Sequence, residues 1–428
     1  MGKGWDMKTK DVVWFINDYA GSPFHGMTFR HYYMSKELQR KGVKAIIITA
    51  SFSHFMNNRP RINDKSYLFE KVDMIEYLWL KVMEYKDSRD KKRVLKWFQF
   101  SFKLFRLPTE ITKPSVIVCS GSAPMLVIPS YFLAKKYGAK LIFEIRDIWP
   151  LTLIDFKGYS KYNPLIYLMQ KSVNFGFRKA DHIISVLPNT DKYIHEQGIH
   201  NFDFTYLPNG IFLEELEHPE PLSKDVKEKL PNGKFTIGYT GAMGMGDGID
   251  LLIDVALLLK KQTDIYFVIV GRGSEKERLQ ARIKDLKLKN IIILDAIPKR
   301  EVQSMLATFD VCYMGWEDKA IYKYGISANK IFDYMYSSKP IVHLFNGEGD
   351  LIEKAKCGIT VKEQDAEKIA EAILKLYIIS ENERVEMGLR GKSFVLEHHT
   401  YQKITENFLN VYRKNKSTRI TRSKFSIS

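Results

Sequence analysis

Lys330 and Asp333 are the first residues of this chain whose types and spacing could do chemistry, because they lie on one face of a predicted helix. A turn with Gly325 and Ser327 precedes that helix in the stretch YKYGISANKIFDYM, residues 322–335. Free N–H groups and the positive dipole end at a helix N-terminus attract an anion, and Lys330 would add a full charge there. The pattern predicts a site for a phosphorylated ligand, although an ordinary amphipathic helix with Lys330 in solvent fits the same residues.

Three further loops with suitable chemistry precede this helix. The glycine-rich stretch TGAMGMGDG, residues 240–248, could cradle a diphosphate on its backbone N–H groups. Residues 271–273, GRG, form a second strand-to-helix turn, and residues 296–298, AIP, could pack against a flat base. Ligands of open α/β sheets bind beyond the carboxyl ends of the strands, so four such loops favour the ligand site over the plain helix. The candidate ligand-binding residues are Gly241, Met243, Gly244, Gly271, Arg272, Ile297, Ser327, Lys330 and Asp333.

The elements that must position these loops are short apolar strands that alternate with helical patterns. Continuous apolar strands, buried on both faces, are typical of parallel sheets covered by helices. The sequence therefore predicts an α/β protein with two doubly wound, Rossmann-like parallel-sheet domains. The predicted strands are residues 12–16, 43–49, 116–119, 141–145, 182–186, 235–239, 266–270, 291–294, 311–314 and 341–344.

A domain boundary is expected where LPNGIF, starting at residue 207, is followed by a stretch rich in Pro, Glu and Lys. We predict an N-terminal domain over residues 1–206, a linker over 207–234 and a C-terminal domain over 235–398. Residues 399–428 are expected to hold a helix, over 401–412, that returns towards the N-terminal domain. A solvated basic tail should follow it, because residues 413–424 carry six basic residues and no acidic one.

Composition limits the function classes. The chain has 428 residues, 45% hydrophobic and 27% charged, which predicts a folded protein of two domains. Its formal charge of +16 favours an anionic partner: nucleic acid, an anionic membrane surface or a phosphorylated substrate. Cys119, Cys312 and Cys357 are too widely spaced for a disulfide framework or a zinc cluster, and a reducing cytoplasm is expected. The first ten residues lack the apolar core of a signal peptide, and no apolar stretch approaches a membrane span.

Two other functions were weighed against the phosphate site. Gly241, Gly244 and Gly246 imitate a dinucleotide fingerprint, and Tyr131 with Lys135 imitates the pair of a short-chain dehydrogenase. However, the next strand offers no acidic residue for the ribose hydroxyls, and the Tyr/Lys pair precedes the glycine loop instead of following it. Nucleic-acid binding would draw on the charge and on 26 Phe and 23 Tyr, but no nucleic-acid module is recognisable.

Taken together, these motifs resemble the retaining glycosyltransferases of family 4, and the likeness covers nearly the whole chain. It includes a glycine turn and helix over residues 21–38, EIRDIWP at 144–150, LPNGIF at 207–212 and VIVGRGSEKERL at 268–279. It also includes the Lys330 helix and CGI at 357–359. EIRDIWP and YGISANKIFDYM look like the branch assigned as L-fucosamine transferases of bacterial O-antigen, capsule or exopolysaccharide synthesis.

The resemblance implies the GT-B fold, in which two Rossmann-like domains face a central cleft. It also implies transfer of a sugar from a nucleotide diphosphate sugar, UDP-linked, with retention at the anomeric carbon. Carried over by residue, Lys330 would bind the diphosphate, Asp333 would bind the ribose and the Ile297 backbone would meet the base. Arg146 and Asp147 would line the cleft and, with Lys330, make up the catalytic set.

Three departures from the family pattern bear on the donor. An acidic residue of the family falls on Gly325 here, which favours a deoxy or otherwise altered donor sugar. A basic pair of many relatives is replaced by Ala242 and by Gly246 or Asp247, so backbone N–H groups and the remaining cations must neutralise the diphosphate. Arg146 stands where many relatives have a His.

The chain contains no Asp-x-Asp triplet, which argues against a metal-bridged diphosphate. We therefore expect an enzyme that needs no metal or other cofactor and keeps its activity in EDTA. Lys330 is expected to stabilise the charge that develops on the departing nucleoside diphosphate.

A second site concerns the acceptor and the membrane. Lys92, Lys96, Gln99, Lys103 and Arg106 would form one polar stripe on a helix over residues 91–107. Such a helix could lie in a bilayer interface with its aromatic residues, Trp97, Phe98 and Phe102, below the headgroups, or it could pack on the N-terminal sheet. The candidate acceptor-binding residues are Gly26, Arg30, Arg59 and Arg61, the arginines being equally explicable as surface charges.

The resemblance, with its departures, thus implies a retaining transferase that moves an N-acetylated deoxyhexose from a UDP-sugar to a polyprenyl-diphosphate-linked saccharide. Its expected place is the cytoplasm, on the inner face of the bacterial cytoplasmic membrane, held there by residues 91–107 and the basic tail. No nucleic-acid partner is expected. The alternative is a nucleotide- or nucleic-acid-binding protein without enzymatic activity on the same scaffold.

Overall fold

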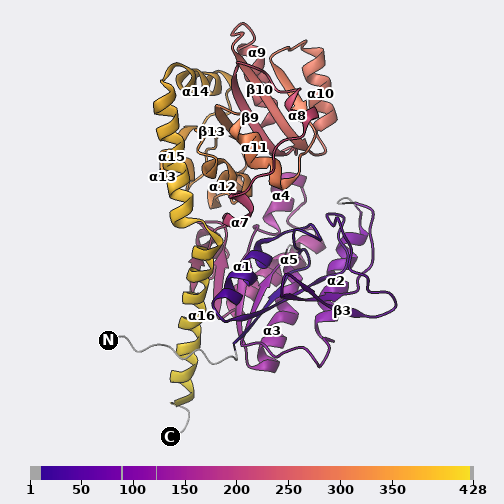
Figure 1. Ribbon diagram of the computed structural model, residues 1–428. Coiled ribbons are helices and arrows are strands. Elements are labelled where there is room, and N and C mark those ends of the chain that lie inside the picture. The colour runs from indigo at the N-terminus through magenta and orange to yellow at the C-terminus, as the bar shows by residue number, and fades with distance from the viewer. Residues whose placement is uncertain (1–10, 88–89, 122, 425–428) are drawn as a thin grey trace. The chain divides into compact units, whose positions relative to one another are not determined.

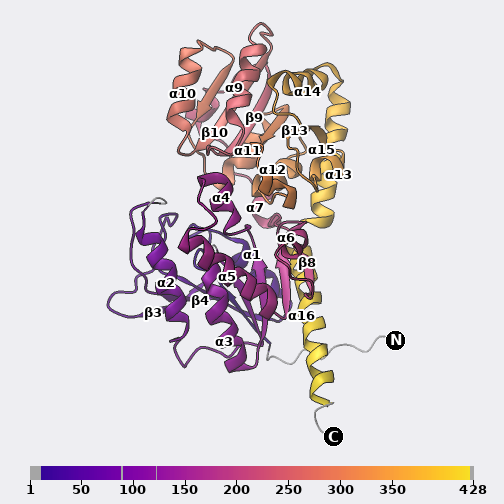
Figure 2. The same ribbon diagram turned by 180° about the vertical axis from the view of Figure 1, so that it is seen from behind.

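The computed structural model describes residues 11–87, 90–121 and 123–424, with side chains as far as Arg413. The prediction about a signal peptide concerns residues outside these ranges. The chain forms two compact units, and Figures 1 and 2 label many of their helices and strands. Unit 1 consists of the residues up to Asn209 together with those from Tyr401 onward, and unit 2 is Gly210–Thr400.

Unit 1 is built on an eight-stranded sheet in the order β3-β4-β2-β1-β5-β6-β7-β8. All neighbouring strands are parallel except β3 and β4, which pair antiparallel at one edge. The central strand β1 reads VVWFI and is buried at every position, as expected of a strand covered on both faces. The strands are β1 (Val12–Ile16), β2 (Lys44–Ala50), β3 (Tyr67–Val72), β4 (Ile75–Leu80), β5 (Val116–Ser120), β6 (Lys140–Ile145), β7 (His182–Ser185) and β8 (Phe204–Tyr206).

Helices cover both faces of the unit 1 sheet (Figures 1 and 2). Crossovers run in opposite directions from β1 and β5, so right-handed connections place α1 and α3 on opposite faces. The α1 helix packs against α16, whereas α3 packs against α2 and α5. These helices are α1 (Arg30–Arg40), α2 (Lys92–Leu104), α3 (Val127–Tyr137), α4 (Leu151–Lys157), α5 (Pro164–Lys179), α6 (Thr190–Glu196) and α16 (Tyr401–Lys424), with a 3-10 turn at Pro124–Leu126.

Unit 2 is built on six parallel strands in the order β11-β10-β9-β12-β13-β14. Two apolar clusters, one on each face, fill the space between sheet and helices. The strands are β9 (Phe235–Ala242), β10 (Ile265–Arg272), β11 (Ile291–Leu294), β12 (Val311–Gly315), β13 (Ile341–Leu344) and β14 (Gly358–Val361). The helices are α7 (Leu213–Leu216), α8 (Lys224–Lys227), α9 (Ile249–Leu258), α10 (Lys276–Asp285), α11 (Val302–Ala307), α12 (Asn329–Tyr336), α13 (Leu351–Ala355), α14 (Ala366–Ile378) and α15 (Glu381–His398), with 3-10 turns at Lys299–Glu301 and Ala320–Tyr324.

The predicted fold class is confirmed, since both units are doubly wound parallel-sheet α/β structures and all ten predicted strands are present. Four strands escaped the sequence analysis: the β3–β4 hairpin, β8 and β14. Both β8 and β14 are only three or four residues long, and the edge strand β3 alternates half-buried and exposed residues instead of forming an apolar run. Edge strands with water on one side lack the continuous apolar signal on which the prediction relied.

Two segments differ from their expected form. The stretch predicted as a linker contains the short helices α7 and α8, and its residues Leu216 and Leu222 are buried in an apolar cluster of unit 2. The last helix, expected to end at Tyr412, continues to Lys424, so its predicted end was wrong. In unit 1 this helix places Phe408 against Phe15 and Tyr401 against Tyr33.

Candidate functional site

The Lys330 side chain is held in a defined place at the carboxyl ends of the unit 2 strands. The first turn of α12 carries it, and its Nζ donates hydrogen bonds to Asp247 Oδ1 at 2.7 Å and to the Tyr239 hydroxyl at 2.8 Å. The ammonium lies 4.5 Å from the centroid of the Tyr239 ring and 5.0 Å from that of Trp316. These partners fix the cation by hydrogen bonds and by its attraction to two aromatic faces.

The Lys330 ammonium is sheltered but still accessible, because its side chain is 13% exposed. Burial lowers the pKa of Lys330, and the neighbouring Asp247 carboxylate acts in the opposite direction by favouring the charged form. A cation in this position can meet an anion that approaches from solvent. The alternative in which Lys330 projects into solvent from an ordinary amphipathic helix was wrong.

Close backbone contacts join the two glycine loops beside Lys330. The Met243 N–H donates to the Arg272 carbonyl oxygen at 2.9 Å. A Cβ atom on Gly271 would lie 1.8 Å from the Gly241 carbonyl oxygen, so no larger residue fits there. A Cβ atom on Gly241 would lie 3.4 Å from Cδ of Lys330, so the lysine chain runs beside this glycine. The structure therefore brings these five predicted residues together.

Arg272 ends β10 with an exposed side chain, and among the described residues it makes no hydrogen bond or ion pair through its guanidinium group. Gly244, in the neighbouring loop, donates its backbone N–H to Asp247 Oδ2 at 3.0 Å. The edge thus presents a free guanidinium group near a lysine whose charge is already paired with a carboxylate.

The Trp316 ring that faces Lys330 is held in place by a hydrogen bond to the buried His343. Its indole Nε1–H donates to His343 Nε2 at 3.1 Å, and His343 Nδ1 lies 3.0 Å from Asp350 Oδ1. The indole N–H can only donate, so His343 Nε2 is the acceptor in this contact. The buried carboxylate and imidazole therefore hold the indole ring beside the Lys330 ammonium.

Asp333 and the loop before α11 meet one helical turn further on. Lys299 Nζ lies 2.6 Å from Asp333 Oδ2, and the Gln303 amide donates to the Asp333 carbonyl oxygen at 3.1 Å. This ion pair ties α12 to the loop that contains Ile297, which is half-buried against an apolar cluster. Ser327 is half-buried directly before α12.

Gly325 adopts φ +97°, which is a left-handed conformation suited to glycine. It ends the 3-10 turn Ala320–Tyr324, and its N–H donates to the Tyr322 carbonyl oxygen at 2.9 Å. An acidic side chain at this position would strain the backbone as it stands.

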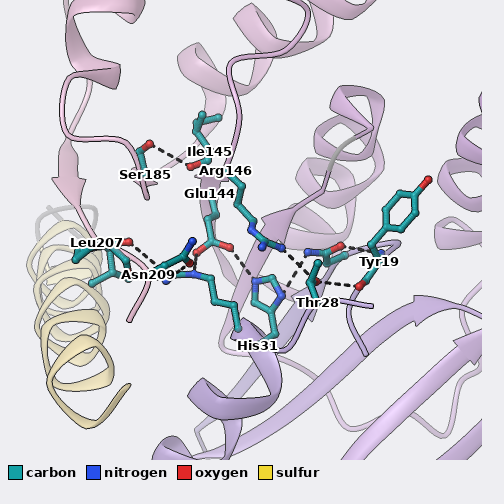
Figure 3. Close-up of polar contacts among 12 residues, drawn as sticks. Tyr19, Thr28, His31, Glu144, Ile145, Arg146, Ser185, Leu207 and Asn209 are labelled. Atoms are coloured by element: carbon teal, nitrogen blue, oxygen red, sulfur yellow. Dashed lines mark hydrogen bonds and ion pairs between the residues drawn. The ribbon is translucent and has the colours of Figure 1, made fainter. Parts of the chain in front are cut away.

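In unit 1, the residues around Glu144 form a buried ionic network (Figure 3). Arg30 Nε donates to Glu144 Oε1 at 2.9 Å, and His31 Nε2 lies 2.8 Å from Glu144 Oε2. The remaining Arg30 donors bind the carbonyl oxygens of Leu207 and Pro208 and the Asn209 side chain.

The prediction that Arg30 binds an acceptor was wrong, and so was its description as a surface charge. Arg30 is only 2% exposed and its guanidinium group is occupied by the protein. Its partner Glu144 lies 114 positions away in the sequence, so no local pattern could indicate the pairing. Arg30 instead holds the backbone of the LPN segment at the end of unit 1.

Arg146 and Asp147 follow β6 at the carboxyl edge of the unit 1 sheet. Arg146 Nη1 donates to Thr28 Oγ1 at 3.3 Å, while its Nε is buried and without a partner among the described residues. Burial lowers the pKa of Arg146, and the nearby Glu144 carboxylate opposes that change. Asp147 is exposed, so both residues remain candidates for contact with a ligand.

The other predicted acceptor residues differ in their surroundings. Gly26 is a turn glycine with φ +82°, and a Cβ atom there would lie 2.9 Å from the Phe55 carbonyl oxygen. Arg59 is exposed, pairs with Glu84 at 2.9 Å and stacks on Phe52. Arg61 is exposed and has no side-chain partner among the described residues. The turn therefore explains why a glycine stands at position 26, and the two arginines lie on the surface.

Lys96 does not lie where the polar stripe predicted on α2 placed it, because it does not face water or headgroups. Lys96 is fully buried, and its Nζ binds Asp18 Oδ2 at 2.9 Å and lies 4.1 Å from the Tyr19 ring centroid. Gln99 accepts a hydrogen bond from the Met83 N–H at 2.6 Å. Since Asp18 follows β1 and offers Lys96 an internal anion, helix periodicity alone placed this residue on the wrong side.

The surface of α2 is instead apolar. Trp97, expected at the membrane, is buried, whereas Phe98 and Phe102 are exposed. The Phe105 ring lies 6.2 Å from Phe132 of α3, which extends the apolar surface. The α2 face is defined here as Leu95, Phe98, Phe102, Phe105 and Phe132, which are exposed by 56%, 40%, 57%, 50% and 52%.

Within the described residues, no group of three or more His, Cys, Asp or Glu side chains is arranged to hold a metal ion. All three cysteines are buried, and burial raises the pKa of each thiol to about 12. None of the helices that the structure describes is long and apolar enough to span a bilayer.

Four residues that contact Lys330 or Asp333 were not predicted as their partners: Tyr239, Asp247, Lys299 and Trp316. In the sequence, Asp247 stands out only as a departure from the family pattern. A signal was present, since Tyr239, Lys299 and Trp316 also follow or end predicted strands. Which side chains meet across those loops depends on strand order, which the sequence did not give.

Comparison with known proteins gives matches to two family models. Residues 24–215 match the model described as Glycosyltransferase Family 4, and residues 234–378 match the model described as Glycosyl transferases group 1. The first range lies mainly in unit 1 and the second in unit 2. Together the two models support a glycosyltransferase.

Curated relatives are distant. An uncharacterized glycosyltransferase of Methanocaldococcus jannaschii is 23% identical over 256 residues, 59% of this chain and 63% of the relative. A poly(ribitol-phosphate) alpha-N-acetylglucosaminyltransferase of Staphylococcus aureus is 26% identical over 179 residues, 41% of this chain and 35% of the relative. WcaI of Escherichia coli, named as a colanic acid biosynthesis glycosyl transferase, is 24% identical over 177 residues, 39% of this chain and 43% of the relative. The chain thus spans less than two thirds of the length of each of these relatives.

Solved structures show the fold. A sucrose-phosphate synthase of Thermosynechococcus elongatus superposes with a TM-score of 0.72 at 14% identity, covering 95% of this chain and 100% of that one. The HepE protein of Anabaena, crystallised with UDP and glucose, superposes with a TM-score of 0.65 at 12% identity, covering 94% and 99%. The GT-B fold expected from the sequence is therefore confirmed for this chain.

Proposed function

We propose that this glycosyltransferase of the GT-B fold transfers a sugar from a nucleotide diphosphate donor bound at the carboxyl edge of the unit 2 sheet. The observation that carries the proposal is the Lys330 ammonium, held beside two glycine loops by Tyr239, Asp247 and Trp316. A departing nucleoside diphosphate gains negative charge, and preorganised donors stabilise that charge more in the transition state than in the ground state. The loops and Lys330 supply donors of this kind.

Residues of the donor site have specific roles in this proposal. Lys330 and the free guanidinium group of Arg272 would neutralise the diphosphate, with the Gly244 backbone N–H. The Ile297 backbone would meet the base. Asp333 would bind the ribose through a carboxylate that Lys299 keeps in place. Ser327 would belong to the donor site because it lies directly before the N-terminus of α12.

We further propose a UDP-linked donor and a reaction that retains the anomeric configuration without a metal ion. UDP is the nucleotide in the complex of the Anabaena HepE protein. Gly325 leaves no acidic side chain for a donor-sugar hydroxyl, which favours a deoxy sugar, and the Staphylococcus aureus relative is named for an N-acetylated one. Arg146 and Asp147 would contact the reacting groups, without a specific proton-transfer role assigned to either.

Nucleotide binding tests the donor class directly. UDP is expected to raise the thermal unfolding temperature of the protein more than GDP, ADP or NAD does, because binding to the folded state alone stabilises it. The same shift is expected in EDTA, since backbone N–H groups and cations would hold the diphosphate. Equal shifts for all nucleotides, or a UDP shift that needs added metal, would contradict the proposal.

For the acceptor, we propose a polyprenyl-diphosphate-linked saccharide of bacterial surface polysaccharide synthesis. The Escherichia coli relative, named for colanic acid biosynthesis, supports the polysaccharide class. Arg59 and Arg61 would meet the acceptor diphosphate, because both are exposed cations on one loop of unit 1. The enzyme would work on the cytoplasmic face of the membrane. The alternative of a non-enzymatic nucleotide- or nucleic-acid-binding protein is not favoured by the family matches.

The α2 face is proposed as the membrane contact. Exposed aromatic side chains bury apolar area in a bilayer interface, and the nearby cations Lys91, Lys92 and Arg106 would meet anionic headgroups. In flotation with vesicles of anionic phospholipid at low salt, the wild-type protein is expected to rise with the lipid. The Phe98→Ser/Phe102→Ser variant should partition at least about tenfold more weakly, because two phenylalanines lose apolar burial.

Ile378→Ser serves as the control for flotation, since Ile378 is an exposed apolar residue of unit 2. It should float like the wild-type protein. A wild-type protein that stays in the soluble fraction, or a double variant that floats undiminished, would remove the α2 face from membrane binding.

A further inference from the structure

The Asp247 carboxylate occupies the position expected for an anionic ligand. Its Oδ1 accepts a hydrogen bond from Lys330 Nζ at 2.7 Å, and its Oδ2 accepts one from the Gly244 backbone N–H at 3.0 Å. Lys330 and Gly244 are both donor-binding residues of the proposed site. A carboxylate and a phosphate offer the same chemistry to such donors, namely two or more anionic oxygens on one atom.

Asp247 and a bound diphosphate would compete for these donors. The Lys330 ammonium has three N–H groups, of which one meets Asp247 and another the Tyr239 hydroxyl. The Asp247 and Lys330 side chains are only 16% and 13% exposed, so repulsion between Asp247 and a second anion would be weakly screened. Binding of both anions to the same donors would therefore be energetically unfavourable.

The surroundings of Asp247 allow its side chain to leave. It lies between Gly246 and Gly248 in the loop that joins β9 to α9, and its carboxylate reaches solvent. Gly248 is fixed against β12, because a Cβ atom there would lie 3.0 Å from the Gly315 backbone. A side-chain rotation of Asp247 therefore suffices to release both donors while the loop keeps its anchor.

We propose that Asp247 is an internal competitor of the donor diphosphate, which binds by displacing the Asp247 carboxylate from Lys330 and Gly244. In the empty site Asp247 keeps the ammonium charged and in place. In the occupied site its displacement lowers the net affinity, so Asp247 sets how tightly donor and product are held. This inference rests on the proposed function, because it assumes that the site binds a nucleoside diphosphate.

Calorimetric titration with UDP tests the inference. Asp247→Asn is expected to bind UDP about tenfold more tightly than the wild-type protein, because a charge-assisted hydrogen bond no longer has to be broken. Asp250→Asn is the matched control. It removes the same charge three residues later, where the carboxylate pairs with Arg278 and Arg282 instead of Lys330. Its affinity for UDP should stay within about twofold of wild type if distant charge has little effect.

A double variant separates competition from general loop damage. In the Lys330→Ala background, Asp247→Asn should improve UDP binding by less than about threefold, because one of the two donors that Asp247 shares with the diphosphate is gone and the two changes are coupled. Should Asp247→Asn fail to fold, as judged by its thermal unfolding, Asp247→Ser replaces it with the same expectation. The improvement in UDP affinity from Asp247→Asn is also expected to decrease as the pH rises. Burial already lowers the pKa of Lys330, and in the variant no Asp247 carboxylate opposes that shift.

The outcomes distinguish this inference from the proposed function. If the wild-type protein binds UDP and Asp247→Asn binds it equally or more weakly, the competitor role is overturned and the donor site stands. An equal gain in Asp250→Asn, or an undiminished gain in the Lys330→Ala background, also overturns it. If neither the wild-type protein nor Asp247→Asn binds any nucleoside diphosphate, the proposed function and the inference both fail.

Discussion

Lys330→Ala is expected to lower turnover by about 100-fold or more, on the scale of losing one strong charge-stabilising donor. The substitution removes the ammonium from the edge where the strands of unit 2 end and leaves Asp247 without its cation. Because charge develops on the leaving diphosphate during the reaction, the loss should appear mainly in kcat and less in KM. The measurement is release of UDP from the sugar nucleotide that stabilises the protein best.

Lys368→Ala is the control for this prediction. Lys368 lies on the exposed face of helix α14 and pairs with Glu371 at 3.2 Å, so its loss should leave turnover unchanged. Thermal unfolding of both variants checks that they are folded. If Lys330→Ala turned over at the wild-type rate, Lys330 would not belong to the reaction site.

Glu144→Ala is expected to lower the free energy of unfolding of unit 1 by about 3–5 kcal/mol, because it leaves a buried guanidinium group without its counter-charge. Arg30 and Glu144 are both almost inaccessible to water, and His31 shares the same carboxylate (Figure 3). Without Glu144, Arg30 keeps the neutral oxygen partners of residues 207–209. Urea unfolding followed by circular dichroism measures the loss.

Two variants bracket the result of Glu144→Ala. Glu144→Gln keeps an acceptor for Arg30 but not the charge, so it should recover part of the loss. Glu371→Ala removes a surface carboxylate and should change the free energy of unfolding by no more than about 0.5 kcal/mol. A Glu144→Ala protein as stable as wild type would mean that the Arg30 charge is compensated elsewhere.

The same network predicts loss of stability in acid. Burial lowers the pKa of His31, despite the nearby Glu144, so the folded state resists protonation that the unfolded state accepts below about pH 6.5. Burial by itself raises the pKa of Glu144, but Arg30 and His31 hold it well below its ordinary value. Its contribution is present above the unfolded pKa of about 4.3 and is lost as the pH falls towards the folded pKa. The free energy of unfolding should therefore begin to fall near pH 6.5 and fall further below pH 4.3.

Local patterns identified those parts of the site that depend on one element at a time. Apolar runs marked ten strands, and the position of Lys330 after a Gly–Ser turn placed it at the start of a helix beyond their carboxyl ends. These features follow from hydrophobic periodicity and from helix-end chemistry, which involve residues close in sequence. Side-chain partners did not follow from the same patterns.

The amino-acid sequence by itself determined two parallel α/β units and a cation, Lys330, at a helix start in unit 2. Only the tertiary structure decided which charges in either unit are available to a ligand. Lys330 meets Asp247 from 83 residues away, Lys96 meets Asp18 from 78 residues away, and Arg30 meets Glu144 from 114 residues away. A cation on a helix looks the same in sequence whether it faces water or a buried carboxylate. Strand order brings the distant partner to it, and desolvation then makes pairing the condition for burying either charge.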